Sequence, residues 1–86
     1  MIKVKVLGSL GKKLGGETFT FNQNSVGLAE AVRTVYGVEG EEEVDYSELL
    51  SSVLVAVNGI AVSGAIEGAV LESGDEVTLI PISHGG

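Results

Sequence analysis

Residues 53–62 read Val-Leu-Val-Ala-Val-Asn-Gly-Ile-Ala-Val, two strand-favouring runs separated by Asn58-Gly59. Asn-Gly is a preferred pair for two-residue hairpin turns, because both central positions of the favoured turn require positive φ. Valine and isoleucine on either side favour extended backbone. This stretch therefore predicts a strand over 53–57, a tight turn, and a short return strand over 60–62.

The chain before this hairpin predicts a second one. Its first strand covers residues 2–6, where isoleucine and valine alternate with lysine, a period of two that is typical of a half-buried strand. Its second strand covers residues 17–21, and we expect Phe19 and Phe21 to point inward. Four glycines and two lysines within residues 8–16 predict the turn that joins the two strands.

A helix is predicted after the second strand, because Leu28, Val32, Val35 and Tyr36 recur at helical spacing. Gly37 stands where a C-terminal cap is expected. Residues of the types that cap helix starts come before the helix, and these are Asn22, Asn24 and Ser25.

The two remaining internal segments carry weaker patterns. Residues 38–44 are acidic and irregular, and we expect a short helix from Asp45, with Leu49 and Leu50 packing beneath it. Residues 63–73 predict a loop that contains one helical turn.

The end of the chain predicts the strand that completes the fold. Gly74-Asp75 forms the last turn and residues 76–81 form the final strand. The order is then strand, strand, helix, strand, short strand, strand. This order predicts an α+β protein with the ubiquitin-like β-grasp fold, a mixed sheet of four to five strands with one main helix. In this fold the first and last strands lie side by side and parallel, which requires a long crossover.

Composition excludes several kinds of function. The 86 residues fit one domain, and 12 acidic against 5 basic residues give a net charge of −7. We expect no nucleic acid and no anionic membrane as partner, because phosphate binding needs clustered lysine and arginine. Without cysteine there is no disulfide or thiolate chemistry, and a single histidine makes no zinc site. With no signal segment and no membrane-length apolar run, we expect a cytoplasmic protein, and we expect a monomer.

The residues after Pro81 are the candidates for a chemical role. They read Ile82-Ser83-His84-Gly85-Gly86, and we divide the chain into a domain over residues 1–82 and a flexible Gly-Gly tail over residues 83–86. Proline lacks an N–H and marks the point where the tail leaves the sheet. A terminal carboxylate becomes reactive when it is joined to AMP, and two glycines let a thin tail enter a narrow channel. The alternative is a frayed, glycine-rich end.

The second half of the chain resembles a known family. The motifs are Val57-Asn58-Gly59, Leu71, the run from Gly74 to Pro81, and Gly85-Gly86. They are similar to the small subunit of molybdopterin synthase and to the thiamine sulfur carrier. The ending His84-Gly85-Gly86 resembles the ubiquitin-related modifier of tRNA thiolation, and the small archaeal modifier proteins lie between these groups. Ile82 stands where molybdopterin subunits commonly have a second proline.

The resemblance implies a function. A separate adenylating enzyme, which uses ATP, would activate Gly86, while Gly85 supplies the slender tail. The product would carry sulfur as a thiocarboxylate, with a sulfurtransferase as partner, or would be joined to lysines of target proteins. The chain itself would bind no cofactor and catalyse nothing. Two alternatives remain open: a synthase subunit whose tail inserts into a large subunit, and a plain interaction module.

Strand parity predicts a docking surface. If Val77 and Leu79 point inward, then the residues between and after them point outward. The outward residues that could form a patch for the activating enzyme are Ile80, Ile82, Leu54 and Ala56, on the face shared with Lys3 and Lys5. The alternatives are a register slip at a bulge, or scattered surface apolar residues without a role.

The charged residues outside the tail each have two interpretations. Lys3, Lys5, Lys12 and Lys13 are candidate acceptors for another modifier, or simply solvated lysines. The acidic run from Glu39 to Asp45 would meet a basic partner, or is a solvated loop. His84 would help to position the tail, or is an ordinary tail residue. The glycines from Gly8 to Gly16 lack the order of a phosphate-binding loop, and no catalytic set of side chains is present.

Overall fold

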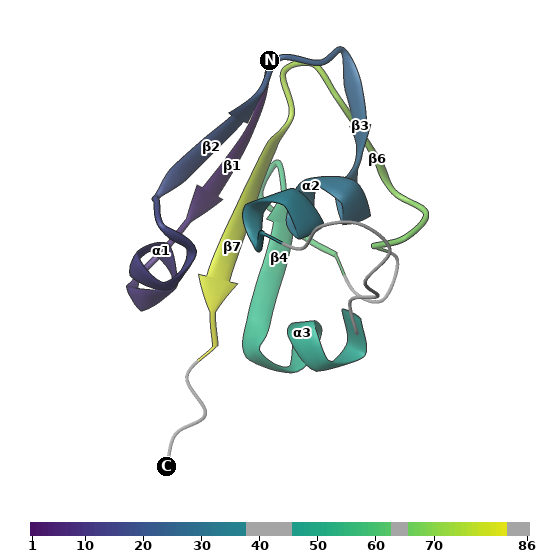
Figure 1. Ribbon diagram of the computed structural model, residues 1–86. Coiled ribbons are helices and arrows are strands. Elements are labelled where there is room, and N and C mark those ends of the chain that lie inside the picture. Colours follow the sequence, from purple (N-terminus) through teal and green to yellow (C-terminus); the bar gives the residue numbers. More distant parts are fainter. Residues whose placement is uncertain (38–45, 63–65, 83–86) are drawn as a thin grey trace.

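The computed structural model describes residues 1–37, 46–62 and 66–82 (Figure 1). Along the chain the elements are β1 (Ile2–Val6), α1 (Ser9–Leu14), β2 (Thr18–Phe21), β3 (Ser25–Gly27), α2 (Leu28–Val35), α3 (Tyr46–Ser52), β4 (Val53–Val57), β5 (Ile60–Ala61), β6 (Val70–Glu72) and β7 (Glu76–Pro81).

Five strands form one mixed sheet in the order β2-β1-β7-β4-β5. β7 lies at its centre, parallel to β1 and antiparallel to β4. Because the last strand of the chain is the middle strand of the sheet, residues from both ends of the sequence share one core. The predicted β-grasp fold is confirmed, including its parallel pairing of first and last strands.

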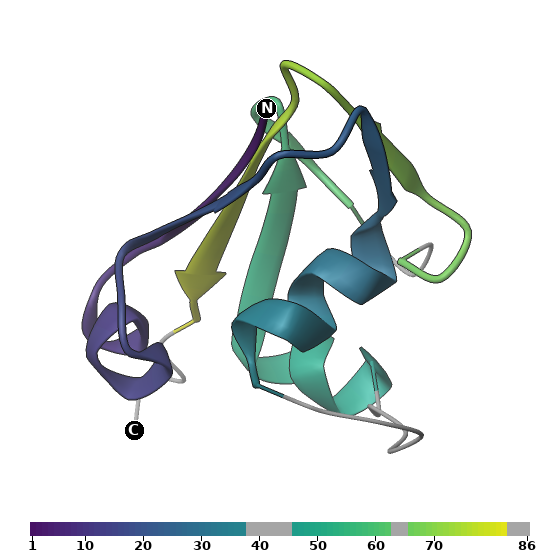
Figure 2. The same cartoon turned by 45° about the horizontal axis from the view of Figure 1, so that its top comes forward.

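Helices α2 and α3 lie on one face of this sheet (Figure 2). The buried residues of α2 recur at the spacing of one helical face, and they are Leu28, Ala31, Val32 and Val35. They meet the inward side chains of β1 and β7, which are Ile2, Val4, Val6, Val77 and Leu79, each at most 2% exposed. Each such aliphatic side chain stabilises the fold by roughly 1.5–3 kcal/mol through removal from water.

The connection between β1 and β2 differs from the predicted turn, because it contains the short helix α1. Leu10 is buried against the core, which anchors the helix. Gly8 and Gly15 bound it with φ of 62° and 84°, conformations that suit glycine. Glycine spacing suggested a turn, and the single buried leucine was too weak a signal to predict a helix.

The start of α2 also differs from the prediction. Gly27 is its N-cap and no side chain caps it, so the assignment of Asn22, Asn24 and Ser25 as capping residues is wrong. Instead Ser25–Gly27 (β3) pairs with Val70–Glu72 (β6) in a two-stranded sheet. Strand β6 lies within residues 63–73, which were predicted as a loop. The N–H of Leu28 donates to the carbonyl oxygen of Ala69 at 2.9 Å, so a backbone group satisfies a first-turn donor that usually needs a side chain.

Three local predictions are confirmed. Gly37 has φ of 73° and its N–H donates to Thr34 at 3.1 Å, which ends α2. Asn58 and Gly59 both have positive φ, 51° and 83°, in the turn between β4 and β5. Leu49 of α3, like its neighbour Leu50, packs half-buried against the core. The acidic run and Asp45 lie outside the described residues.

Candidate functional site: the outer sheet face and the root of the tail

Two backbone features fix the point where the chain leaves the sheet. Pro81 pairs with Val53 as the last pair between β7 and β4. One residue later, the N–H of Ile82 donates to the carbonyl oxygen of Ser52 at 2.8 Å. Ser52 ends α3, where carbonyl groups lack helical partners, so this bond satisfies one of them. The tail residues Ser83, His84, Gly85 and Gly86 lie outside the described residues, and the predictions for them stay predictions.

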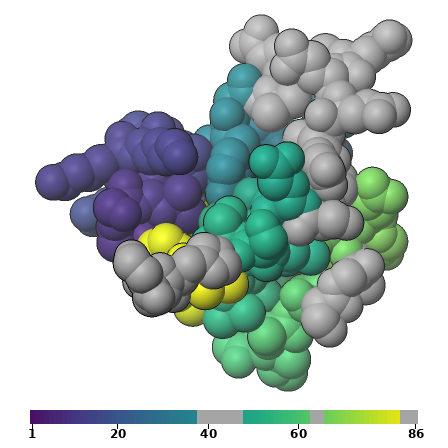
Figure 3. All heavy atoms as spheres, turned by 90° about the horizontal axis from the view of Figure 1, so that it is seen from below, coloured from purple at the N-terminus to yellow at the C-terminus, as the bar shows by residue number. Residues whose placement is uncertain are grey.

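Gly8 lies close to Pro81 on the other side of the same point. A Cβ atom on Gly8 would stand 3.4 Å from the Cγ atom of Pro81. Gly8 has φ 62° and ψ −148°, a backbone region that is essentially restricted to glycine. The connection after β1 can therefore pass against the proline ring. Seen from below, the end of β7 (yellow) reaches the surface between the purple β1–α1 region and the green α3–β4 region (Figure 3).

Apolar side chains gather on the outer sheet face at this end. Leu54 lies opposite Ile80 in the register of β4 and β7, at the distance where cross-strand side chains touch. The N–H of Leu7 donates to Leu79 at 3.0 Å, so Leu7 extends this row beyond β1. The exposed fractions are 45% for Leu7, 39% for Leu54 and 40% for Ile82. We call Leu7, Leu54, Ile80 and Ile82 the tail-end patch.

The parity on which this patch was predicted is confirmed. Val77 and Leu79 are buried, and Leu54 and Ile80 share the outward side of adjacent strands. Leu7 was missed, although the same parity that placed Lys3 and Lys5 outward also places Leu7 there. Ala56 faces the same way but is only 8% exposed. Its small side chain lies between Thr78 and Ala61 in the register, so it offers little surface.

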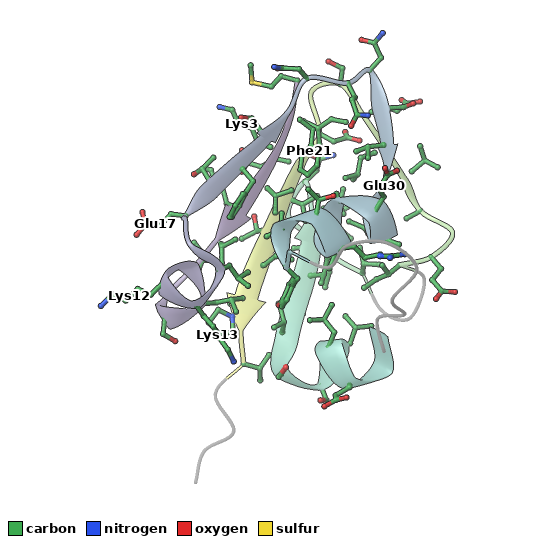
Figure 4. All side chains as sticks on the ribbon, viewed as in Figure 1. Lys3, Lys12, Lys13, Glu17, Phe21 and Glu30 are labelled. Atoms are coloured by element: carbon green, nitrogen blue, oxygen red, sulfur yellow. The ribbon has the colours of Figure 1, made fainter. Side chains whose placement is uncertain are left out.

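The candidate acceptor lysines lie on β1 and α1, and all four are exposed. Lys3 and Lys5 project from β1 on the outer face, and the Nζ atom of Lys5 lies 3.4 Å from a carboxylate oxygen of Glu76. Both side chains are largely exposed, so this ion pair contributes little to stability. Lys12 and Lys13 occupy the last turn of α1 (Figure 4). Their role as acceptors stays a prediction.

A polar network joins two turns at the opposite end of the sheet. The side-chain amide of Asn58 donates to Asp75 at 3.0 Å, and its oxygen accepts from the N–H of Glu76 at 3.0 Å. The second carboxylate oxygen of Asp75 accepts from the N–H of Glu72 at 2.8 Å. The bond from Glu72, followed by that from Asn58, lowers the pKa of Asp75. This network fixes the turn that leads into β7.

Other kinds of site find no support in the part of the chain that the structure describes. No group of three or more His, Cys, Asp and Glu side chains there is placed to hold a metal ion. None of the described helices is long and apolar enough to cross a bilayer.

Comparisons with known proteins agree with this architecture. No family model and no curated protein matches the sequence. Among solved structures, SAMP1 of Haloferax volcanii superposes with a TM-score of 0.70 at 24% identity, over 99% of this chain and 98% of that one. Urm1 of Sulfolobus solfataricus gives 0.70 at 20% identity, over 93% and 99%.

A third solved structure is the complex of subunits 1 and 2 of molybdopterin-converting factor from Helicobacter pylori 26695, with a TM-score of 0.54 at 21% identity, over 99% of this chain and 97% of that one. These likenesses establish the fold: this chain is a ubiquitin-like β-grasp protein. The predicted resemblance to archaeal modifiers, the ubiquitin-related modifier and the molybdopterin subunit is confirmed at that level.

Proposed function

We propose that this chain is a ubiquitin-like carrier or modifier whose Gly86 carboxylate is activated by a separate adenylating enzyme. One observation carries the proposal: the central strand β7 ends beside the exposed tail-end patch, only a few residues before Gly85-Gly86. A partner that covers the patch receives the end of the chain at a defined place.

The chemistry needs a partner that binds ATP. The Gly86 carboxylate attacks the α-phosphorus of ATP, pyrophosphate leaves, and a mixed anhydride with AMP forms. Hydrosulfide or a lysine amine then attacks the carbonyl carbon, the nucleophile loses a proton, and AMP leaves. The first nucleophile leads to a thiocarboxylate for sulfur transfer, and the second gives an isopeptide bond to a target protein. Gly85 leaves the backbone beside the reacting carbon unobstructed.

The tail-end patch is the docking surface in this proposal. Leu54, Ile80 and Ile82 were predicted for this role, Leu7 joins them, and Ala56 contributes little area. Clustered exposed apolar side chains mark interaction surfaces more often than scattered ones. Lys3, Lys5, Lys12 and Lys13 are the proposed acceptors if copies are joined in chains.

The test is the intact mass of the protein, tagged at its N-terminus and purified from its native host. The expected result is a population in which one oxygen of Gly86 is replaced by sulfur, or adducts that join Gly86 to a target lysine. Deletion of Gly86 should abolish both without changing the thermal unfolding midpoint. A chain found only at its unmodified mass, in a host that expresses its adenylating enzyme, would overturn the proposal.

A second function is supported by one specific likeness. The matched molybdopterin-converting factor structure contains two different subunits, so this chain is a candidate small subunit of a two-subunit synthase. Stable one-to-one co-purification with a single larger protein, lost on deletion of Gly85-Gly86, would favour this function over the first.

A further inference from the structure

The strand β2 forms an open edge of the main sheet. It is the first strand in the order β2-β1-β7-β4-β5, and its register with β1 runs without a bulge from Thr18 to Phe21. Figures 1 and 2 show no described element alongside its outer side. Natural edge strands are usually protected by lysine, proline or a bulge, and β2 reads Thr-Phe-Thr-Phe.

The hydrogen-bonding pattern shows which β2 backbone groups point outward. The N–H of Lys3 donates to Asp75 and that of Leu7 to Leu79, so odd-numbered residues of β1 bond toward β7. The N–H of Val6 donates to Glu17 at 2.8 Å, so even-numbered residues bond toward β2. Residues opposite one another alternate between bonded and unbonded pairs in an antiparallel ladder.

It follows that Thr18 and Thr20, opposite Lys5 and Lys3, are in the unbonded pairs. Their N–H and carbonyl groups therefore face away from β1, toward the open edge. Within the described residues no group occupies these donors and acceptors. The other edge strand, β5, has only Ile60–Ala61, so β2 offers the longer template of the two.

The side chains beside this edge differ between its two faces. On the inner face, Phe19 and Phe21 pack against the core but remain partly exposed. Figure 4 shows Phe21 directed inward. On the outer face, Thr18 and Thr20 are exposed, and the next strand presents Lys5 and Lys3 beside them.

We infer that β2 binds an extended peptide segment of a partner protein, in which apolar residues alternate with acidic ones. The segment adds a sixth strand to the sheet, bonded to the outward groups of Thr18 and Thr20. Its apolar side chains cover the exposed parts of Phe19 and Phe21. Its acidic side chains lie on the outer face, about 10 Å from the backbone of β1, within reach of the flexible Lys3 and Lys5 stems.

Charge complementarity selects this occupant. Lys3 and Lys5 account for two of the five basic residues in a chain of net charge −7, and they lie one strand from the open edge. These two lysines would repel a segment that carries basic residues on this face. Lys5 already has Glu76 at 3.4 Å, so Lys3 is the principal cation.

This binding site is distinct from the tail. β1 separates β2 from β7, whose end leads into the tail. A bound segment therefore leaves the end of β7 free, and the site does not depend on the proposed activation of Gly86.

The test uses an eight-residue capped peptide in which valine alternates with glutamate, titrated into the full chain and followed by amide chemical shifts. The expected result is shifts centred on residues 18–21, with β5 unaffected. Thr20→Pro removes one outward N–H that β1 does not use, and proline is tolerated on edge strands. This variant should bind at least about tenfold more weakly, since it loses a main-chain hydrogen bond and blocks close approach.

Three controls make the result decisive. Thr20→Val keeps the N–H and should bind like the wild type, which separates backbone pairing from side-chain shape. Lys3→Glu should lower the affinity for the glutamate peptide by about threefold at low salt. A peptide with lysine in place of glutamate should bind the wild type more weakly than the glutamate peptide does. Equal binding by Thr20→Pro and Thr20→Val, in variants with unchanged thermal midpoints, would overturn the inference, and so would shifts arising only from dimerisation of the chain through β2.

Discussion

Ile82 and Ser52 are joined by a backbone hydrogen bond of 2.8 Å, in which the N–H of Ile82 donates to the carbonyl oxygen at the end of α3. β4 begins at the next residue, Val53, which pairs with Pro81. The last described residue of the chain is thus tied to the junction of α3 and β4, which also positions Leu54. The end of β7, Ile82 and Leu54 therefore belong to one hydrogen-bonded structural unit.

Gly8 lies close to Pro81 on the other side of this unit. We expect Gly8→Ala to lower the free energy of unfolding by about 1–3 kcal/mol, because the backbone of Gly8 lies in a region that costs other residues this much. Chemical denaturation measures the loss, and faster amide exchange at Ile82 should accompany it. Gly15→Ala is the control, since its φ is also positive but nothing lies within 4 Å of the added Cβ. Equal losses in both variants would contradict an added cost at Gly8 from its backbone region and its approach to Pro81.

The tail-end patch gives a prediction about activation. Leu54→Glu should slow ATP-dependent activation by the host's adenylating enzyme at least about tenfold, as loss of a central apolar contact does at other interfaces. Pyrophosphate release measures the rate. Val70→Glu is the matched control, because Val70 is 66% exposed on β6, away from the patch. Both variants should unfold within about 0.5 kcal/mol of the wild type. Equal rates for the two variants would exclude the patch as the docking surface.

The turn between β4 and β5 yields a prediction about stability. Asn58→Gly keeps the positive φ of the turn but removes two side-chain hydrogen bonds, to Asp75 and Glu76, and should lower the free energy of unfolding by about 1 kcal/mol. Asn58→Ala should lose about 1 kcal/mol more, because alanine resists left-handed backbone. Denaturant titration of both variants separates the two effects. An unchanged Asn58→Gly protein would show that the network does not stabilise the turn.

The same network predicts a dependence on pH. The hydrogen bonds from Glu72 and Asn58 lower the pKa of Asp75, so the unfolded chain binds a proton on this group more readily than the folded chain. Its stabilising effect is therefore complete above the ordinary aspartate pKa of about 4 and is lost as pH falls through the lower, folded value. Asp75→Asn should be less stable than the wild type at pH 7, with a smaller difference near pH 2. A difference independent of pH would contradict this assignment.

For Tyr36 we predict a substitution that does not lower the free energy of unfolding. Among the described residues its buried hydroxyl finds no hydrogen-bond partner, and burial raises its pKa. An unsatisfied buried polar group is unfavourable, so Tyr36→Phe should leave the free energy of unfolding unchanged or raise it by up to about 1 kcal/mol. Thermal and denaturant unfolding check this. A loss above about 1 kcal/mol would mean that the hydroxyl has a partner in the folded protein.

The strands of the main sheet were predictable because each carries its own pattern. Alternation fixed β1 and β2, the Asn58-Gly59 turn fixed β4 and β5, and β7 spans the predicted residues 76–81. Their pairing followed from the order of elements, since the fold admits few ways to bury these faces. Parity along β7 then placed most of the tail-end patch.

The missed elements are those stabilised by distant parts of the chain. Strand β3 has only three residues and forms because β6, far along the sequence, pairs with it. The start of α2 has no side-chain cap because the carbonyl of Ala69 accepts from Leu28. The propensity of a local stretch of sequence predicts neither of these contacts, because both depend on residues far along the chain and tertiary pairing overrides local propensity. Helix α1 was hidden by its glycines, which suggested a turn.

The central place of β7 couples maturation of the fold to the chemistry proposed for its end. The sheet cannot be completed before β7 enters between β1 and β4, so a chain that stalls in folding has neither a formed patch nor a fixed exit point. Under the proposed function, an activating enzyme that requires both the patch and the exit point would activate only fully folded chains. The strand order would then select for folded chains, since a misfolded chain would not be activated. No separate protein would be needed to reject it.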